Sequence, residues 1–557
     1  MHSDPGRFSS IRNWCTQHPR WTLTLLTLAA LLPFLSKPFN LDDPLFVWAA
    51  QQIHAHPTAP YGMSVNWFNV PSPMGKVMLN PPLMSYYLAG AGFLGWSEAG
   101  LHLACMLPAV ALVLGSFRLA GHFCRWPMFA ALATLFVPSV FVSATTVMCD
   151  VLMLALWTWA VVFWVEGLPS GRAAKLSVAG VLMGLCLLAK YNGICLLPLL
   201  AAYGLIVRRK PGSWCLFLLL PIAMFLAYEW MTIRVYGRSH FFVSCQFAQW
   251  VQASGVFNFF SKMLNALTFS GGGFAIALFC LPWLWRPRGM LLLAGAGALL
   301  VALAMTGGFM TNYGQFTGSW PWLECQMWFW AAGGVGILSL AGLEVWQKRD
   351  PASWLLLLWV AGVFAFAFSF NWTINIRVLL PMAPAVAVLV ARRLERNRTT
   401  LPAGAQGSLA ACAMLSLVVA QADFQQASNT RKAVVEIGAR HAAGPGKISI
   451  AGHWGFQYYL QSIGARPLDE AHIELAPDDL LAVQQINTSG LKIAPELLVL
   501  REAFSLPDFP GLATMNFAVG GGFYSHAMGP LPFAFGPVPP EWFFLYDLKR
   551  PPKANAQ

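Results

Sequence analysis

Charged residues are scarce in this chain. Asp, Glu, Lys and Arg make up 10% of its 557 residues, against roughly 25% in a typical soluble protein. Hydrophobic residues make up 57%. So few charges exclude an ordinary water-soluble surface for most of the chain, which must therefore lie in lipid or inside a helix bundle.

Acidic residues are rarer than basic ones: 23 Asp and Glu against 35 Lys and Arg give a formal net charge of +12. A positive charge can indicate nucleic-acid binding. Here, however, the basic residues stand in short clusters between apolar runs, which is typical of membrane topology. We therefore predict no nucleic-acid partner.

Several other signals are absent. The 11 cysteines form no CxxC pair and none follows Cys412, so neither a zinc site of that type nor a disulfide framework is indicated. There is no P-loop, dinucleotide fingerprint or solenoid repeat, which argues against the nucleotide-binding folds and repeat proteins that those patterns mark. No small-residue cleavage site follows the first apolar run, so we predict a retained first span rather than a signal peptide.

Long apolar runs dominate what is present. Because a membrane-spanning helix needs about 20 mostly apolar residues, we expect an all-α polytopic membrane domain at 20–422, after a cytoplasmic N-terminus at 1–19. About 13 spans fit this length. They are 20–37, 98–119, 127–146, 150–166, 174–190, 192–207, 213–233, 270–285, 289–306, 324–346, 352–370, 374–391 and 406–422.

The apolar stretch 82–96, in a first outer loop at 38–97, is short and follows Pro81 and Pro82. We expect an interfacial or half-inserted helix there. With the N-terminus inside, every basic cluster then lies in a cytoplasmic connection, whereas a further span at 82–96 would place them all outside. The clusters are Arg118 with Arg125, Arg172 with Lys175, Arg208 to Lys210, Arg286 with Arg288, Lys348 with Arg349, and Arg392, Arg393, Arg396 and Arg398.

An odd number of spans leaves residues 423–557 on the outer side. There the apolar runs shorten, and charges and prolines become more frequent. Short β-type runs at 447–451 and 496–500, with a helical pattern at 456–463 between them, favour a small extracytoplasmic α/β domain.

Ionisable and polar residues gather at the outer ends of the expected spans, where their cost makes function the first hypothesis. A carboxylate can accept a proton from an attacking hydroxyl, and Lys and Arg can hold a phosphate. The set therefore fits group transfer from a lipid-phosphate donor. Its acids are Asp42, Asp43 and Asp150, and its other members are Lys76, Asn80, Lys190, Tyr191, Arg234, Arg238, His240 and Arg377.

Simpler roles remain open for these residues. Asp42 and Asp150 could do no more than cap helices. Lys190 and Arg377 could be anchors that reach toward the interface, and His240 could be an ordinary loop residue.

Several segments follow one another in a characteristic order. The acidic pair after the first span is followed by Pro-Pro-Leu at 81–83, Asp150, Leu-Ala-Lys-Tyr-Asn-Gly at 188–193, Arg-Val-Leu-Leu-Pro at 377–381 and the segment 452–459. Over most of the chain this order resembles the GT-C glycosyltransferases. It is most similar to bacterial relatives of the protein O-mannosyltransferases and of the lipid A aminoarabinose transferase.

The resemblance implies a membrane fold with an outward-facing cavity and a polyprenyl-phosphate-sugar donor. It implies that Asp42 is the catalytic residue of the first loop, with Asp43 at the usual Glu position, that Asp150 is a second acid, and that Lys190 lies near the donor phosphate. Asn80 stands where relatives have His or Lys. No Arg follows the acidic pair as it does in the aminoarabinose branch, which argues against lipid A modification.

We therefore expect a hexosyl- or pentosyltransferase in the inner (plasma) membrane, acting on a lipid, glycan or protein hydroxyl at the outer face. Asp42 and Asp150 could also hold Mg²⁺ or Mn²⁺, although no cofactor is certain. The alternative is a transporter or flippase of an anionic lipid-linked solute, which would place charges at mid-span. The sequence leaves open the sugar, the acceptor, the stereochemical outcome and which of Asp42 and Asp43 is the base.

Overall fold

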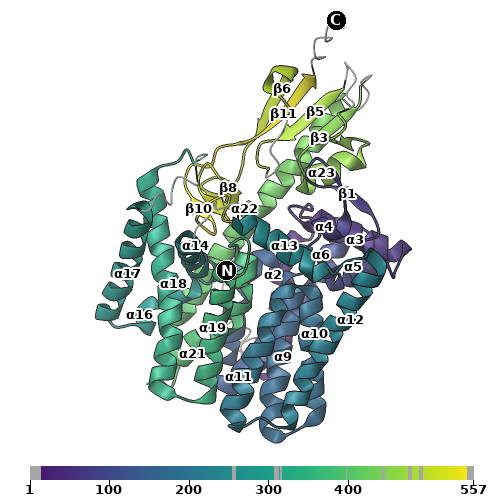
Figure 1. Cartoon of the computed structure of the whole chain (residues 1–557). Helices are drawn as coiled ribbons and strands as arrows, with labels where there is room; N and C mark the ends of the chain where they lie inside the picture. The colour runs from purple at the N-terminus through teal and green to yellow at the C-terminus, as the bar shows by residue number, and fades with distance from the viewer. Residues whose placement is uncertain are drawn as a thin grey trace, which may run out of the picture.

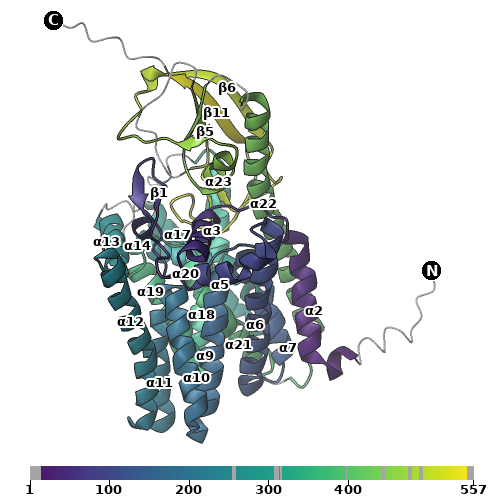
Figure 2. The same cartoon turned by 90° about the vertical axis from the view of Figure 1, so that its right-hand side faces the viewer.

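The computed structural model describes residues 14–548 except 254–258, 307–312, 314–315, 397, 442–445, 474–478 and 488–492. A helix bundle forms its larger part, and a part containing strands lies over one end of the bundle (Figures 1 and 2). Among the described residues, eight helical segments are long and apolar enough to cross a membrane. They are α6 (Glu98–Phe123), α9 (Asp150–Ser170), η3 (Tyr191–Cys195) with α11 (Leu196–Arg208), η4 (Ser213–Leu218) with α12 (Leu219–Tyr236), α17 (Pro287–Thr306), α18 (Trp320–Lys348), α19 (Pro351–Ser369) and α22 (Ala403–His441).

The predicted polytopic all-α membrane part is confirmed, but the predicted number of spans is not. The remaining predicted spans are shorter or interrupted helices. Proline explains two of the interruptions, because it lacks an N–H and clashes with the preceding turn: Pro138 begins α8, and Pro381 lies in η6. These segments are α2 (Pro19–Leu31) with η1 (Leu32–Phe34), α7 (Pro127–Leu135) with α8 (Pro138–Ser143), α10 (Ala173–Ala189), α14 (Phe259–Gly273) with α15 (Ile276–Phe279) and α16 (Leu281–Leu284), and α20 (Ile376–Leu379) with η6 (Leu380–Met382) and α21 (Ala383–Leu394).

Two stretches that we predicted to be outer loops contain helices. The stretch 234–269 holds α13 (His240–Ala253) and most of α14, so helix begins at Phe259 rather than at residue 270. The first outer loop holds α3 (Asp43–Ala55), the hairpin β1 (Ser64–Asn66) and β2 (Pro71–Pro73), and α4 (Met74–Val77). The stretch predicted as one interfacial helix at 82–96 is α5 (Leu83–Ala91) followed by η2 (Gly92–Leu94).

Side chains from the predicted basic clusters meet at the end of the bundle away from the strands. Arg118 donates to Glu166 at 2.6 Å, and Arg392 donates to Glu344 at 2.7 Å and to the carbonyl of Phe123 at 3.2 Å. These contacts join α6, α9, α18 and α21. The clusters that contain Arg118 and Arg392 therefore lie at the same end of the bundle, as the topology prediction requires.

The core of the bundle supports the break between α20 and α21. Trp157 of α9 and Trp359 of α19 are fully buried and stacked, with ring centroids 6.0 Å apart. The indole N–H of Trp359 donates to the carbonyl of Pro381 at 2.7 Å. A buried donor thus satisfies a carbonyl at the interruption, and α20 is held at a fixed place against the bundle.

Helix α22, a single helix of 39 residues, connects the bundle to the C-terminal part. The predicted domain boundary at residue 423 lies inside this helix. Beyond it, α23 (Trp454–Ser462) accompanies a five-stranded sheet of order β4-β3-β5-β11-β6. The predicted β-runs and intervening helix are present, with shifted ends. The strands are β3 (Ile448–Ala451), β4 (Arg466–Pro467), β5 (Leu480–Gln484), β6 (Leu498–Leu506, preceded by η7, Pro495–Leu497) and β11 (Glu541–Leu548); β3 pairs in parallel with β4 and β5, and β11 pairs antiparallel with β5 and β6.

Between β6 and β11 the chain returns to the bundle. We call residues 511–536 the return segment; it contains β7 (Leu512–Ala513), β8 (Met515–Asn516), β9 (Gly521–Gly522) and β10 (Ala534–Phe535). The backbone N–H of Ile376 donates to the carbonyl of Phe523 at 3.0 Å, and that of His526 donates to Ile374 at 2.8 Å. The C-terminal part therefore supports α20 directly.

Candidate active site

Four charged residues predicted from the sequence meet at the end of the bundle that faces the C-terminal part. Asp150, the first residue of α9, is at the centre: its Oδ1 accepts from Nζ of Lys190 at 2.7 Å, and its Oδ2 accepts from Nε of Arg377 at 2.7 Å. Nη1 of Arg377 donates to Oδ2 of Asp42 at 2.8 Å. Arg377 thus joins two carboxylates that are far apart in the sequence.

Exposure distinguishes the two carboxylates. The side chain of Asp150 is 2% exposed, whereas that of Asp42 is 37% exposed. Lys190 and Arg377 are also nearly buried. Burial of ion pairs is weak evidence for stability, because desolvation offsets the Coulomb attraction. It does fix the orientation of the groups, and it leaves Asp42 as the carboxylate that a substrate can reach.

The simpler roles do not fit this geometry. Asp42 stands at the N-cap of α3, but its side chain makes no capping hydrogen bond. Asp150 is paired with two cations. Lys190 and Arg377 point to Asp150 rather than along the apolar surface toward water. Their arrangement is therefore that of an ion-paired site.

Asp43 has a different environment from Asp42. Its side chain is buried, and its two oxygens accept from the backbone N–H groups of Asn40 at 3.0 Å and Val147 at 2.8 Å. Burial raises the pKa of Asp43 to about 7, against the lowering effect of these hydrogen bonds and of the cations Lys37 and Arg377. Asp43 thus joins the turn before α3 to the segment before Asp150.

Short local structures present Lys190 and Arg377. Lys190 is extended (φ −158°, ψ 136°) between α10 and η3. The turn after it requires Gly193, because a Cβ there would lie 2.7 Å from the backbone nitrogen of Leu187. Asn375 caps α20 by accepting from the N–H of Val378 at 2.9 Å. Both cations therefore stand on backbone that neighbouring groups hold in place.

A second polar cluster adjoins Lys190 through the next residue, Tyr191. Its hydroxyl lies 2.8 Å from Nδ1 of His240 and 3.2 Å from the carboxylate of Glu229. Nε2 of His240 lies 2.8 Å from the carbonyl of Met78, which can only accept, so Nε2 carries the proton. Burial lowers the pKa of His240, so its neutral form is favoured. His240 is therefore a buried link between α13 and the first outer loop.

Other predicted site residues lie elsewhere. Lys76, Arg234 and Arg238 are exposed and form no ion pair with a described residue. Arg234 lies over the ring of Trp230 at 5.5 Å. Asn80 contributes its carbonyl, which accepts from the hydroxyl of Tyr61. The structure therefore brings none of these four side chains to Asp150.

The sequence reasoning missed a buried ion pair between Lys37 and Asp423. Asp423 of α22 also accepts from the hydroxyls of Thr514 at 3.0 Å and Tyr524 at 2.9 Å, both in the return segment. Glu229, which bonds to Tyr191 in the second polar cluster, lies inside a predicted span and was missed as well. Each of these residues is an ionisable group in or beside an apolar run, and that signal could have identified them.

The site formed by Asp42, Asp150, Lys190 and Arg377 does not fit a divalent cation that its two aspartates would share. Both oxygens of Asp150 are bound by cationic side chains, and the guanidinium of Arg377 bridges Asp150 and Asp42. Among the described residues, no group of three or more His, Cys, Asp or Glu side chains is arranged to hold a metal ion.

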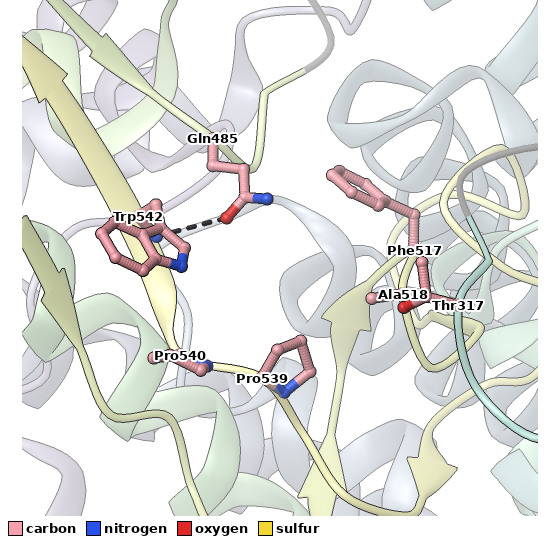
Figure 3. Close-up of a pocket in the computed structure, with 7 residues that line it drawn as sticks. All are labelled: Thr317, Gln485, Phe517, Ala518, Pro539, Pro540 and Trp542. Atoms are coloured by element: carbon pink, nitrogen blue, oxygen red, sulfur yellow. Dashed lines mark hydrogen bonds between the residues drawn. The ribbon is translucent and has the colours of Figure 1, made fainter. Parts of the chain in front are cut away.

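A cavity of about 470 Å³ lies between the C-terminal part and Thr317, which precedes α18, and none of these site residues lines it (Figure 3). Phe517 and Trp542 face it from opposite sides, and the side-chain oxygen of Gln485 accepts from the backbone N–H of Trp542 at 3.3 Å. Its lining includes no charged residue. The charged site at Asp150 is therefore separate from this cavity, which is lined by Thr317, Gln485, Phe517, Ala518, Pro539, Pro540 and Trp542.

Residues 80–231 match the dolichyl-phosphate-mannose-protein mannosyltransferase family model. This segment contains Asp150, Lys190 and Tyr191, and it ends before Arg377. The match confirms, over these residues, the family resemblance predicted from the sequence. No curated protein matches the chain.

Among solved structures, an oligosaccharyltransferase from Archaeoglobus fulgidus tethered to an acceptor peptide is similar at 13% identity and a TM-score of 0.47. The alignment covers 82% of this chain and 64% of that one. ArnT from Cupriavidus metallidurans bound to undecaprenyl phosphate is similar at 14% identity and a TM-score of 0.42, over 83% of this chain and 92% of that one.

Proposed function

We propose that this protein is a membrane glycosyltransferase that moves a sugar from a polyprenyl phosphate to a hydroxyl acceptor. One observation carries the proposal: a partly exposed carboxylate, Asp42, is held by Arg377 beside a buried Lys190–Asp150 ion pair. The arrangement offers a base for the acceptor and cations for a phosphate within one site. The family match over 80–231 supports the same class of reaction.

Asp42 takes the proton of the acceptor hydroxyl while the acceptor oxygen forms a bond to the anomeric carbon of the sugar. The bond between that carbon and the phosphate oxygen breaks, and its electron pair leaves with the polyprenyl phosphate. Arg377 and Lys190 offset the charge that develops on the leaving phosphate. Two of the five guanidinium N–H groups bond to Asp42 and Asp150, so others remain as donors to phosphate.

Asp150 orients both cations. With both of its oxygens bonded to Lys190 and Arg377, its role is to set their direction and to balance their charge. A single displacement of this kind inverts the anomeric carbon, whereas a double displacement, in which Asp42 first forms a bond to the sugar and the acceptor hydroxyl then displaces Asp42, would retain its configuration. In this site a divalent cation would have only Asp42 as an accessible carboxylate.

We place the site at the outer face of the inner membrane. The charged site and the basic clusters lie at opposite ends of the bundle, and the basic end is the cytoplasmic one by the positive-inside rule. The donor is then a lipid-linked sugar of the outer leaflet, and the acceptor is a lipid, glycan or protein hydroxyl. A transporter would require charges at mid-span, whereas Asp42 precedes α3 and Asp150 begins α9.

The test is transfer of a labelled sugar from a polyprenyl phosphate by the purified protein in lipid nanodiscs. We expect Asp42→Asn to lower kcat by about 100-fold or more, the usual contribution of a general base. Asp547→Asn is the matched control, because Asp547 is 35% exposed and also pairs with an arginine, Arg501. Asp42→Asn turnover within twofold of wild type, or movement of the lipid-linked sugar across liposomes without transfer, would refute the proposal.

A further inference from the structure

Helix α23 of the C-terminal part lies against the chain that leads into α3 (Figures 1 and 2). Gly455, in the first turn of α23, is packed against the backbone of residues 39 and 40. A Cβ at Gly455 would lie 2.3 Å from the carbonyl oxygen of Phe39 and 3.5 Å from Cα of Asn40. Only glycine fits there, so the helix and this turn are in direct backbone contact.

Tyr459, four residues after Gly455 in α23, bonds to the same stretch of chain, the turn formed by residues 39–42 before α3. Its hydroxyl accepts from the backbone N–H of Phe39 at 2.7 Å and donates to Oε1 of Glu98 at 2.9 Å. Glu98 also pairs with Arg431 of α22 at 3.2 Å. The hydroxyl of Tyr459 thus connects the turn to α6 and, through Glu98, to α22.

The turn held in this way has an unfavourable backbone. Leu41, immediately before Asp42, has φ +49° although it carries a branched side chain, and that side chain is buried. Trp454, the first residue of α23, has φ +64°. Non-glycine residues keep such conformations only where surrounding contacts impose them. Here the contacts of Gly455 and Tyr459 meet the two residues that precede Leu41.

We infer that α23 is a positioning element for the proposed catalytic base, and that Gly455 and Tyr459 are its positioning residues. The inference rests on the proposed role of Asp42. With Gly455 and Tyr459 in contact, the turn holds Leu41 in its left-handed conformation and Asp42 beside Arg377. Without these contacts, Leu41 relaxes and Asp42 leaves Arg377, while the Asp150–Lys190 pair stays in place.

The experiment compares Gly455→Ala and Tyr459→Phe with two matched controls in the transfer assay. Gly407→Ala adds a Cβ in α22 where no atom lies within 4 Å. Tyr458→Phe removes a hydroxyl from the neighbouring residue, whose ring packs edge-on against that of Phe39 with the ring centroids 5.3 Å apart. We expect both α23 variants to lower kcat by about tenfold or more, as misplacement of a reacting group does, with the donor KM within about twofold. The controls keep the wild-type kcat.

Hydrogen exchange of the peptide that contains residues 38–43 gives a readout that needs no turnover. Tyr459→Phe removes the acceptor of the Phe39 N–H, so exchange of this peptide rises, while Tyr458→Phe leaves it unchanged. If Asp42→Asn is inactive but both α23 variants keep their kcat, the inference is wrong and the proposed function stands. If wild type transfers no sugar, the function fails and unchanged exchange in Tyr459→Phe overturns the inference as well.

Discussion

The structure distinguishes two adjacent residues, Asp42 and Asp43, by their exposure. The sequence left open which of Asp42 and Asp43 is the base, because adjacent aspartates have the same chemistry. Burial separates them: the carboxylate of Asp42 is 37% exposed, whereas Asp43 is buried with two backbone N–H donors. Exposure depends on which distant segments cover a turn, and the local sequence around two adjacent aspartates does not show which segments these are.

The raised pKa of Asp43 predicts a pH dependence of stability. An aspartate whose pKa rises to about 7 on folding stays protonated in the folded protein while the unfolded chain ionises. The contribution of Asp43 to the free energy of unfolding is therefore complete below its ordinary pKa. It is lost as pH rises to about 7, by about 1.4 kcal/mol per pH unit. Thermal unfolding of wild type and Asp43→Asn between pH 5 and 8.5 measures this contribution. We expect the stability of wild type relative to Asp43→Asn to fall up to pH 7 and then to level off. A relative stability that does not vary with pH would show that Asp43 does not titrate in this way.

A second prediction about a single residue concerns Arg377. Its Nε and Nη1 reach two different carboxylates at once, which the single ammonium group of lysine cannot reproduce. Arg377→Lys keeps the charge but loses one charge-assisted hydrogen bond. At about 1.5–3 kcal/mol for such a bond, transfer should slow by roughly 10- to 100-fold. Arg234→Lys is the control, since Arg234 is exposed and lies over Trp230. Equal activities of the two variants would show that charge alone suffices at residue 377.

At the scale of elements, hydropathy predicted the long apolar helices and missed shorter helices whose apolar runs are interrupted by polar residues. Segments such as α9 and α19 are apolar along their whole length, so they were predicted directly. Gln246, Gln249 and Gln252 interrupt the apolar run of α13, and Lys262 and Asn265 interrupt that of α14, so neither helix forms an apolar run of about 20 residues. The return segment was missed for another reason: it has only two-residue strands, and it bonds to α20 and α22, which are far away in the sequence.

The position of α13 depends on His240, and this can be tested. The side chain of His240 bonds to the carbonyl of Met78 and to the hydroxyls of Tyr191 and Tyr228. His240→Ala leaves the carbonyl of Met78 and the hydroxyl of Tyr228 without their hydrogen-bond partner, at a cost of about 1–3 kcal/mol. We expect the thermal midpoint of unfolding to fall by several degrees, whereas His56→Ala, at the exposed end of α3, leaves it unchanged. The same midpoint in both variants would contradict this role.

At the scale of the whole molecule, the C-terminal part and the bundle form the site together. The sequence predicted a small extracytoplasmic α/β domain at 423–557, separate from the membrane part. In the structure, α23 contacts the turn before Asp42, and the return segment bonds to the backbone on either side of Asn375, just before Arg377. Two of the four charged residues of the site are therefore supported by the part of the chain that follows the bundle, and neither support was visible in local patterns.

Gly529→Ala tests whether this support is needed. A Cβ at Gly529 would lie 2.1 Å from the backbone of Gly520, where the return segment folds on itself. The added methyl group forces Phe523 and His526 away from α20, and overpacking of this kind costs about 1–3 kcal/mol. Because Arg377 is then released on one side, we expect sugar transfer to fall more than tenfold while the protein still inserts. Gly362→Ala, in α19 with no atom within 4 Å of the new Cβ, is the control. A Gly529→Ala protein as active as Gly362→Ala would mean that the bundle alone holds Arg377 against Asp42 and Asp150.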